Sequence, residues 1–381
     1  MKIIIAPDSF KGSIDSLTAS RILSEAVRHI YPDAKILSYP LGDGGEGTLE
    51  ILSKNGKCHK KQIECSDPLG RPITPETLFL EDGNAAYIES ASICGLPLLT
   101  PQERNPFELT SFGLGTAIVK TLEHGVKRIY LGLGGTATVD GGIGMLSALG
   151  WRFIDENDNI LKGKGKDLLK INRIHSPASP FDKQVEIIAL CDVRNPLLGT
   201  QGAVNIFGPQ KGLLKEDLPL AEKGMINFAE KTICHTQNNF IMKEGAGAAG
   251  GIGFALFSYL DATYRSGINF LMNKSGFSAD IEGADLVITG EGCIDRQSLM
   301  GKVVGGILTK CLNKKIPVLA FGGKVKDREV LLKEGISGIC PITPVNIPTD
   351  EAMKPEIAEY NLYTAALRFF NDPDKNFLGT S

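Results

Sequence analysis

The chain has 381 residues, 42% of them hydrophobic, so it can bury a large core, and at this length two domains are expected. Its formal net charge of −3 and its short basic runs argue against nucleic acid or an anionic membrane surface as a partner. No apolar run is long enough to span a membrane, and the sequence enters a strand without a leader segment, which predicts a cytoplasmic protein.

Short runs of β-branched residues alternate with segments of helical period, a pattern typical of a mainly parallel α/β sheet. In the N-terminal part we expect a strand at 2–6, a helix at 17–30 and a strand at 35–39. Further strands are expected at 87–90, 128–132, 185–190, 285–289, 317–321 and 338–342. The middle of the chain has longer loops and fragments suited to antiparallel pairing. These elements predict a discontinuous doubly wound domain, Rossmann-like or flavodoxin-like, from residues 1–70 plus 280–381, with a second α/β domain inserted at 71–279.

Glycine and a carboxylate together follow most of the predicted strands. Asp8 follows the first strand, the segment from Asp43 to Glu46 follows the second, and Asp140 lies in the glycine-rich stretch 132–144. Asp192 follows the strand that ends near residue 190, and Glu291 follows the strand that ends at 289. Because the carboxyl ends of parallel strands line one crevice, these turns are expected to face a common ligand site.

Glycine lets backbone amides approach a ligand closely, which suits phosphate, especially where a helix begins directly afterwards. A carboxylate in the same loop would repel phosphate unless a divalent cation lies between them or the acid accepts a proton. Amides for phosphate oxygens, with acids for Mg²⁺ and for a general base, are what phosphoryl transfer from a nucleotide requires. In any single loop, however, the acid could equally cap a turn.

The same residues can be compared with the sequence patterns of two other kinds of nucleotide site. No segment satisfies the Walker A pattern G-x-x-x-x-G-K-[ST], so the chain is not an ordinary P-loop enzyme. A dinucleotide fingerprint is matched by Gly132, Gly134 and Ala137 after a strand, with Asp155 near the expected distance. An NAD-dependent 2-hydroxy-acid oxidoreductase is therefore an alternative, and a non-catalytic nucleotide sensor is another. Asp140 argues against the first of these, because a metal-free dinucleotide site gains nothing from an extra negative charge.

Taken together, the motifs resemble the bacterial type of the glycerate kinase family, which phosphorylates D-glycerate with ATP. The resemblance rests on seven ordered strings, "APDSFKGS" at 6–13, "DGGEGT" at 43–48, "GLGGTATVDGG" at 132–142, "CDVRNPLLG" at 191–199, "GPQKG" at 208–212, "GAGAAGG" at 245–251 and "GEGCIDRQSLMGK" at 290–302. It implies a two-domain α/β kinase with its site in the cleft between the domains, using ATP and Mg²⁺. The sequence leaves open whether the chain forms a homo-oligomer.

Roles for single residues follow from the chemistry of this reaction. Asp192 is the first choice of general base and Asp8 the second, with Lys11 and Asn195 beside them in the catalytic set. Lys11, together with Arg194 or Lys302, is expected to supply the cations that hold a carboxylate or a phosphate. The remaining predicted substrate and phosphate contacts are Asp43, Gly44, Gly45, Glu46, Gly134, Gly135, Thr136, Asp140, Gly247, Gly250 and Gly251. Glu291 and Asp295 are the expected metal ligands, in a pool that also includes Asp43 and Glu46.

The predicted reaction is ATP-dependent phosphorylation of D-glycerate, and the resemblance to the bacterial type of the family implies 2-phosphoglycerate as the product. The alternative product is 3-phosphoglycerate, because the two outcomes differ only in which hydroxyl points at the γ-phosphate, and no residue pattern decides between them.

Overall fold

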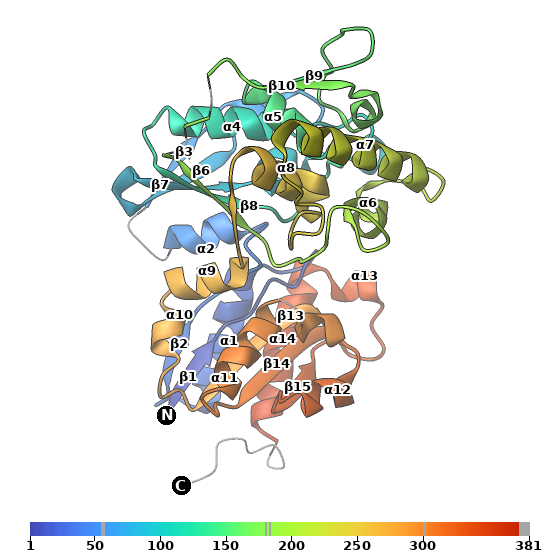
Figure 1. The fold of residues 1–381 in the computed structure, drawn as a ribbon. Helices are drawn as coiled ribbons and strands as arrows, with labels where there is room; N and C mark the ends of the chain where they lie inside the picture. Colours follow the sequence, from blue (N-terminus) through green and yellow to red (C-terminus); the bar gives the residue numbers. More distant parts are fainter. Residues whose placement is uncertain (55–57, 180, 183, 300–301, 373–381) are drawn as a thin grey trace. The chain divides into compact units, whose positions relative to one another are not determined.

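The computed structural model describes residues 1–54, 58–179, 181–182, 184–299 and 302–372. They form two compact units, each built from an α/β sheet (Figure 1). The first unit comprises Met1–Asp43, Glu50–Asn55 and Ile268–Ser381, and the second comprises Gly44–Leu49 and Gly56–Gly267. The helix α2 (Thr48–Lys54) contains the junction between Leu49 and Glu50. Among the described residues, no helix combines the length and the apolar character needed to cross a bilayer.

The first unit contains a five-stranded parallel sheet in the order β15-β14-β13-β1-β2. Its strands are β1 (Lys2–Ile5), β2 (Lys35–Ser38), β13 (Leu286–Ile294), β14 (Val318–Val325) and β15 (Gly338–Pro341). Strands from opposite ends of the chain thus lie side by side, the blue β1 next to the orange β13 (Figure 1). Counted within the unit, the strand order is 2-1-3-4-5, the flavodoxin-like order, which confirms the predicted α/β class.

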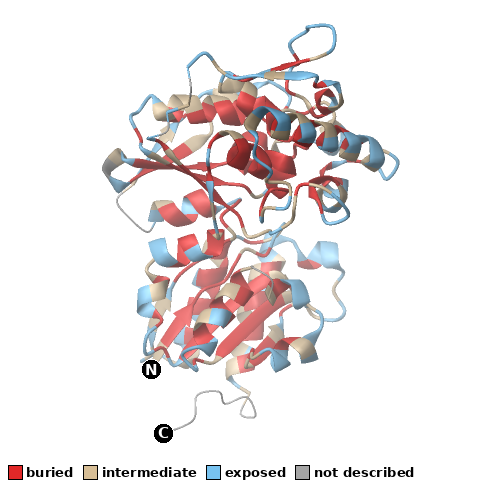
Figure 2. Ribbon diagram, in the orientation of Figure 1, coloured by how far each residue is buried: buried red, intermediate tan, exposed pale blue. Residues whose placement is uncertain are grey.

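Helices cover both faces of this sheet. On one face α1 (Ser16–Ile30) and α14 (Pro355–Phe370) pack together over Ile3, Ile5 and Phe321. Asp15 caps α1, since its carboxylate accepts a hydrogen bond from Thr18 N at 2.7 Å. The helix α11 (Val303–Leu312) contacts β13 and β14. With both faces covered, the central strands are buried along most of their length (Figure 2).

Four short helices complete the first unit. They are α9 (Gly267–Lys274), α10 (Phe277–Asp280), α12 (Arg328–Lys333) and α13 (Thr349–Ala352). Ile268 and Met272 of α9 lie against Gly306 of α11, which places residues 268–280 with the first unit. The predicted boundary at 280 therefore differs from the observed one by the two helices α9 and α10, since these short helices carry no strong sequence signal of the sheet that they pack against.

The second unit contains a six-stranded mixed sheet in the order β12-β11-β8-β7-β6-β3. The four strands β7 (Ala85–Glu89), β8 (Arg128–Gly132), β11 (Glu186–Leu190) and β12 (Thr263–Arg265) are parallel. The other two, β3 (His59–Gln62) and β6 (Glu76–Leu80), pair antiparallel, as the fragments in the middle of the chain suggested. Because β3 joins this sheet, the predicted boundary at 70 also differs from the observed division.

Helices and two small hairpins surround the second sheet. The helices are α3 (Ala91–Cys94), α4 (Phe112–Leu122), α5 (Ile143–Ala148), α6 (Ala203–Phe207), α7 (Leu218–Thr236) and α8 (Ile252–Tyr259). The hairpins pair β4 (Cys65–Ser66) with β5 (Pro72–Ile73) and β9 (Arg152–Ile154) with β10 (Arg173–His175). Trp151 and Phe153 belong to the large core of this unit, as predicted for Trp151.

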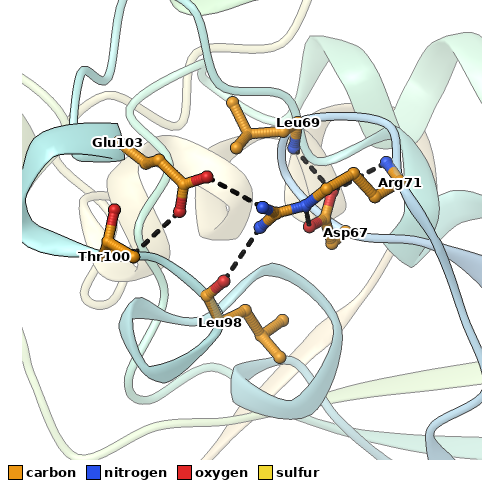
Figure 3. Close-up of polar contacts among 6 residues, drawn as sticks. All are labelled: Asp67, Leu69, Arg71, Leu98, Thr100 and Glu103. Atoms are coloured by element: carbon orange, nitrogen blue, oxygen red, sulfur yellow. Dashed lines mark hydrogen bonds and ion pairs between the residues drawn. The ribbon is translucent and has the colours of Figure 1, made fainter.

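An arginine ties the β4–β5 hairpin to a neighbouring loop (Figure 3). The Asp67 carboxylate, almost fully buried, accepts hydrogen bonds from Leu69 N and Arg71 N at 2.9 Å each and pairs with the Arg71 guanidinium. The other end of that guanidinium donates to Glu103 Oε1 at 2.8 Å and to the carbonyl of Leu98 at 3.0 Å. With both ends of the fork engaged in turn-holding contacts, this cluster is structural.

Candidate active site

The strand order of the first sheet reverses between β1 and β13, and this is the point at which doubly wound sheets bind ligands. Asp8 follows β1, and its backbone N–H donates to the carbonyl of Gly290 in β13 at 2.8 Å. Glu291 is the next residue of β13. The sheet topology therefore brings together two carboxylates that are 283 positions apart in the sequence.

A cavity of about 570 Å³ opens at this edge of the sheet. Every residue that lines it belongs to the first unit. Five of the predicted site residues line it, namely Asp8, Lys11, Asp43, Glu291 and Lys302. The rule that strand ends converge thus succeeded for the part of the sequence that forms this sheet.

Asp8 is the most perturbed acid in the cavity. Its side chain is 7% exposed and accepts a hydrogen bond from Ser9 N at 2.7 Å. Burial, followed by the negative charge of Asp43, raises the pKa of Asp8 from 3.8 to about 7, against the opposing effects of Ser9 N–H and Lys11. A carboxyl group that titrates near neutral pH is suited to accept a proton during a reaction.

Two lysines balance the negative charge of the cavity. Lys11 Nζ lies 3.4 Å from Asp43 Oδ2, and its side chain is largely exposed. Lys302 Nζ lies 3.8 Å from Glu291 Oε2 at the start of α11. The cavity therefore offers both carboxylates and ammonium groups within one concave surface.

Glu291 has the features of a metal ligand. Its side chain is 7% exposed, and burial raises its pKa, which Lys302 and a side-chain interaction with Ser298 oppose. Its Oε1 atom is buried and has no hydrogen-bond partner among the residues that the structure describes. A hard oxygen atom left without a partner suits Mg²⁺, which is commonly held by one or two carboxylates together with substrate phosphates.

The other predicted metal ligand, Asp295, makes hydrogen bonds within its own turn, and its role toward a metal stays a prediction. Asp295 Oδ1 accepts a hydrogen bond from Gln297 N at 2.9 Å, and Asp295 N donates to Ser298 Oγ at 3.0 Å, so this residue holds the turn after β13. Over the described parts of the chain, no group of three or more His, Cys, Asp or Glu side chains could hold a metal by itself. The residues present therefore fit a metal that arrives with its own phosphate ligands.

In the second unit, the segment after β11 carries three predicted site residues. The Asp192 carboxylate accepts a hydrogen bond from Ser266 Oγ at 2.6 Å. Asn195 donates through its side-chain amide to the carbonyl of Gln201 at 2.8 Å, while Arg194 is exposed, 3.9 Å from Glu244. These contacts hold the loop, and the catalytic roles of the three residues stay predictions.

The structure gives Asp140 a place different from the predicted one. The residue has no exposed surface, and its carboxylate accepts hydrogen bonds from Ser111 N and Ser111 Oγ at 2.7 Å each and from Gly142 N at 3.1 Å. Burial raises its pKa, and these donors oppose the rise. The Asp140 carboxylate thus accepts hydrogen bonds from backbone amides of its own loop and of the start of α4. A carboxylate in a glycine-rich turn is as well suited to those donors as to a ligand.

The structure also bears on the predicted phosphate-binding glycines of the 245–251 stretch. Gly247, Gly250 and Gly251 are buried, and a Cβ atom on Gly250, whose φ is +68°, would lie 2.0 Å from the carbonyl oxygen of Thr138. Gly141 N donates to the carbonyl of Gly250 at 3.0 Å. Glycine is needed at position 250 because two backbones touch there, and the phosphate-binding role of these three glycines stays a prediction.

Two glycines of the 132–144 stretch remain accessible. Gly135 is exposed and Gly134 is half-buried, so both stay predicted phosphate contacts. Thr136, in contrast, is buried and accepts a hydrogen bond from Lys211 Nζ at 2.9 Å. Among the residues after β2, Gly44 and Gly45 are buried, and Glu46 is exposed with its Cβ near Gly135.

Sequence reasoning gave no role to two buried charged residues. Lys211 Nζ donates to Thr136 Oγ1 and to the carbonyl of Thr138, both at 2.9 Å, and burial lowers its pKa to about 8. Glu89 accepts hydrogen bonds from Gly47 N at 3.2 Å and Leu49 N at 3.1 Å. Their partners lie 40 or more residues away along the chain, and the only signal was that Lys211 lies within one of the quoted motifs, "GPQKG".

The structure does not support Asp155 as the acidic residue of a dinucleotide-binding site. Asp155 Oδ1 accepts hydrogen bonds from Asn157 N at 2.8 Å and Asn159 N at 2.9 Å, in the turn that follows β9. An acid that closes its own turn is not the ribose-binding acid of a dinucleotide fold.

A doubly wound sheet with a cavity of acids and lysines at its switch point has the layout of a small-molecule phosphotransferase. The sequence model of the glycerate kinase family matches residues 3–371, so the chain belongs to the glycerate kinase family, as its motifs indicated, and it is a glycerate kinase.

Individual relatives agree over nearly the full chain. The glycerate kinase of Bacillus subtilis strain 168 is 36% identical over 371 residues, which cover 96% of each chain. The glycerate 2-kinase of Escherichia coli K12 is 37% identical, with 93% of each chain covered. A crystal structure of a protein described as glycerate kinase 2 of Salmonella typhimurium LT2 superposes with a TM-score of 0.79, at 34% identity and 97% coverage of each chain. The α/β fold is thus shared with an experimentally solved protein.

Proposed function

We propose that this glycerate kinase transfers the γ-phosphoryl group of Mg-ATP to the 2-hydroxyl of D-glycerate. The observation that carries the proposal is the cavity at the β1–β13 switch point, in which Asp8, with a pKa of about 7, lies among Lys11, Asp43 and Glu291. The name of the Escherichia coli relative, glycerate 2-kinase, supports the choice of hydroxyl. Transfer to the 3-hydroxyl is the alternative.

In the proposed reaction, the glycerate hydroxyl oxygen bonds to the γ-phosphorus while the bond from that phosphorus to the departing ADP oxygen breaks. The hydroxyl proton passes to the Asp8 carboxylate, which is mostly ionised above pH 7. This reassigns the base from Asp192, the first choice from sequence, to Asp8, because Asp8 combines burial with a pKa near neutrality.

The charges of the cavity suit the two substrates. Lys11 and Lys302 are placed to neutralise phosphate oxygens or the glycerate carboxylate, since ammonium groups act as point charges toward such anions. Bound Mg²⁺ would neutralise charge that develops on the β- and γ-phosphates, with Glu291 holding it. Arg194, Gly134 and Gly135 remain predicted contacts of the substrates, and Asn195 remains in the predicted catalytic set.

The proposal is tested by mixing purified protein with Mg-ATP and D-glycerate and recording ADP release and the phosphorus NMR spectrum of the product. We expect ADP release that depends on glycerate, and a resonance that splits as expected for 2-phosphoglycerate. A 3-phosphoglycerate resonance would overturn the choice of hydroxyl. Nucleotide binding with no glycerate-dependent ADP would indicate a sensor and contradict the proposed reaction.

Glu291→Gln should weaken the use of Mg²⁺. The amide keeps the shape of the side chain but supplies a neutral ligand, so we expect the Mg²⁺ concentration for half-maximal activity to rise about tenfold or more. The matched control is Asp295→Asn, which removes a carboxylate that serves the adjacent turn. Equal Mg²⁺ dependence in Glu291→Gln and wild type would show that Glu291 is not a metal ligand.

A further inference from the structure

The cavity at the switch point has two chemically different ends. Its charged end contains the carboxylates and lysines described above. Its other end is lined mainly by apolar residues from the ends of β14 and β15 and the segment that follows, with Thr343 and Thr349 among them; the apolar residues are Val325, Pro341, Ile342, Pro344, Val345, Ile347, Ala352 and Met353. The two ends belong to one continuous space of about 570 Å³.

A three-carbon acid would occupy only a small part of this space. Cavities of about 300–1,000 Å³ enclose ligands of drug size, lined by apolar groups with a few polar groups that fix orientation. Glycerate carries charge and hydroxyl groups at nearly every position, so the apolar end offers it no favourable contact. The size and lining of that end require a second, larger and less polar ligand portion.

Several backbone groups at the apolar end are either engaged or lack a donor. Pro341 and Pro344 have no N–H, and Ile342 N donates to the carbonyl of Gly322 at 2.9 Å. The carbonyl of Pro344 accepts a hydrogen bond from Ile347 N at 3.2 Å. A ligand is therefore held here mainly by contact with apolar side chains.

The wall on this side is formed by two segments in contact. A Cβ atom on Gly12 would lie 2.8 Å from Met353 Cε, so the loop after β1 approaches the residue that follows α13. The same loop carries Asp8 and Lys11 at the charged end. One loop thus borders both ends of the cavity, and a single ligand can extend from one to the other.

We propose that the apolar end, formed by residues 341–353 with Val325, binds the nucleoside of the phosphoryl donor, while its phosphates extend to the lysines and Glu291 at the charged end. The inference rests on the proposed function for the identity of the donor. Its physical basis is the match between an amphiphilic cavity and a ligand with a flat, weakly polar base at one end and a polyphosphate at the other.

The test fills the apolar end from a partly exposed position. Met353, 38% exposed, is replaced by tryptophan, and the matched control is Met242→Trp, at a methionine of the second unit that is 77% exposed and does not line the cavity. Val345→Trp, at a fully exposed position of the cavity rim, provides an independent variant. Binding of a fluorescent ATP analogue is titrated without glycerate, and kinetics are measured separately.

We expect Met353→Trp and Val345→Trp to weaken analogue binding and raise the KM for Mg-ATP about tenfold or more, with the KM for D-glycerate changed less than about twofold. Inhibition by inorganic tripolyphosphate, which has no nucleoside, should be the same in wild type and variants. Met242→Trp should match wild type throughout.

Two results separate this inference from the proposed function. If wild type phosphorylates glycerate while both cavity variants bind the analogue normally, the nucleoside lies elsewhere, and the inference is overturned while the proposed function stands. If the variants lose analogue binding but wild type shows no glycerate-dependent ADP, the nucleoside site stands and the proposed reaction is wrong. Equal loss of tripolyphosphate inhibition in the cavity variants would contradict the division of the cavity into two ends.

Discussion

Asp8→Asn is expected to lower kcat by about 10²–10⁴-fold, the usual contribution of a positioned general base. The amide cannot accept the hydroxyl proton, although it preserves the size of the side chain and the acceptor for Ser9 N. Steady-state rates of ADP release at saturating Mg-ATP and D-glycerate measure the effect. A rate within about tenfold of wild type would show that another group accepts the proton.

The same substitution is expected to stabilise the protein at alkaline pH. The pKa of Asp8 is about 7 in the folded chain and 3.8 when unperturbed, so the folded state binds more protons between these values. Wild-type stability therefore falls as pH rises from about 4 through 7, and the cost is fully present above pH 7. Asp8→Asn removes it and should raise Tm at pH 8 by a few degrees. Asp33→Asn, at an exposed turn, is the control and should leave Tm unchanged.

A protein that gains stability and loses activity by one substitution would show that the buried acid is kept for function. If Asp8→Asn instead lowers Tm at pH 8, the carboxylate stabilises the fold, and its raised pKa has a structural origin.

Asp140→Ala is expected to destabilise the second unit by about 3–5 kcal/mol, because it leaves several buried donors without an acceptor. Ser111 N and Gly142 N both donate to the Asp140 carboxylate in the interior, where that residue has no exposed surface. Urea unfolding followed by circular dichroism measures the change. The matched control is Asp155→Ala, which also removes an acceptor of two backbone N–H groups but in an exposed turn, and it should have a much smaller effect.

The opposite result for Asp140 would restore its predicted role. If Asp140→Ala unfolds at the wild-type urea concentration and has lost activity, then the carboxylate acts on a substrate or metal. Loss of both stability and activity in proportion to the unfolded fraction agrees with a structural role.

The part of the site that sequence predicted correctly depends on a rule of topology. Asp8 and Glu291 follow runs of buried β-branched residues, and parallel strands of one sheet end at the same edge, so their proximity needed no knowledge of side-chain contacts. The helix cap at Asp15 is a local feature, since it depends on residues three positions apart.

What the sequence does not predict are the contacts that loops make with distant parts of the chain. In the sequence, Asp140 and Asp8 look alike, as acids beside glycine or proline after a strand. They differ in their surroundings. Ser111, from a distant segment, donates a hydrogen bond to Asp140, whereas Asp8 lines a cavity. Gly250 likewise looks like a phosphate-binding glycine until its contact with Thr138 is known. Lys211 and Glu89 form hydrogen bonds with segments that are far away along the chain. The predicted domain boundary at residue 70 differs from the observed one for a similar reason, because β3 pairs with β6 in the second sheet.

The most direct test of the central claim, that Asp8 is the general base, is the pH dependence of kcat/KM for D-glycerate at saturating Mg-ATP in wild type and in Asp192→Asn. The account predicts that kcat/KM falls below a single apparent pKa of about 7 in both proteins, because Asp8 must be ionised to accept a proton. A wild-type profile that stays flat down to pH 5, or one whose acidic limb disappears in Asp192→Asn, would contradict it.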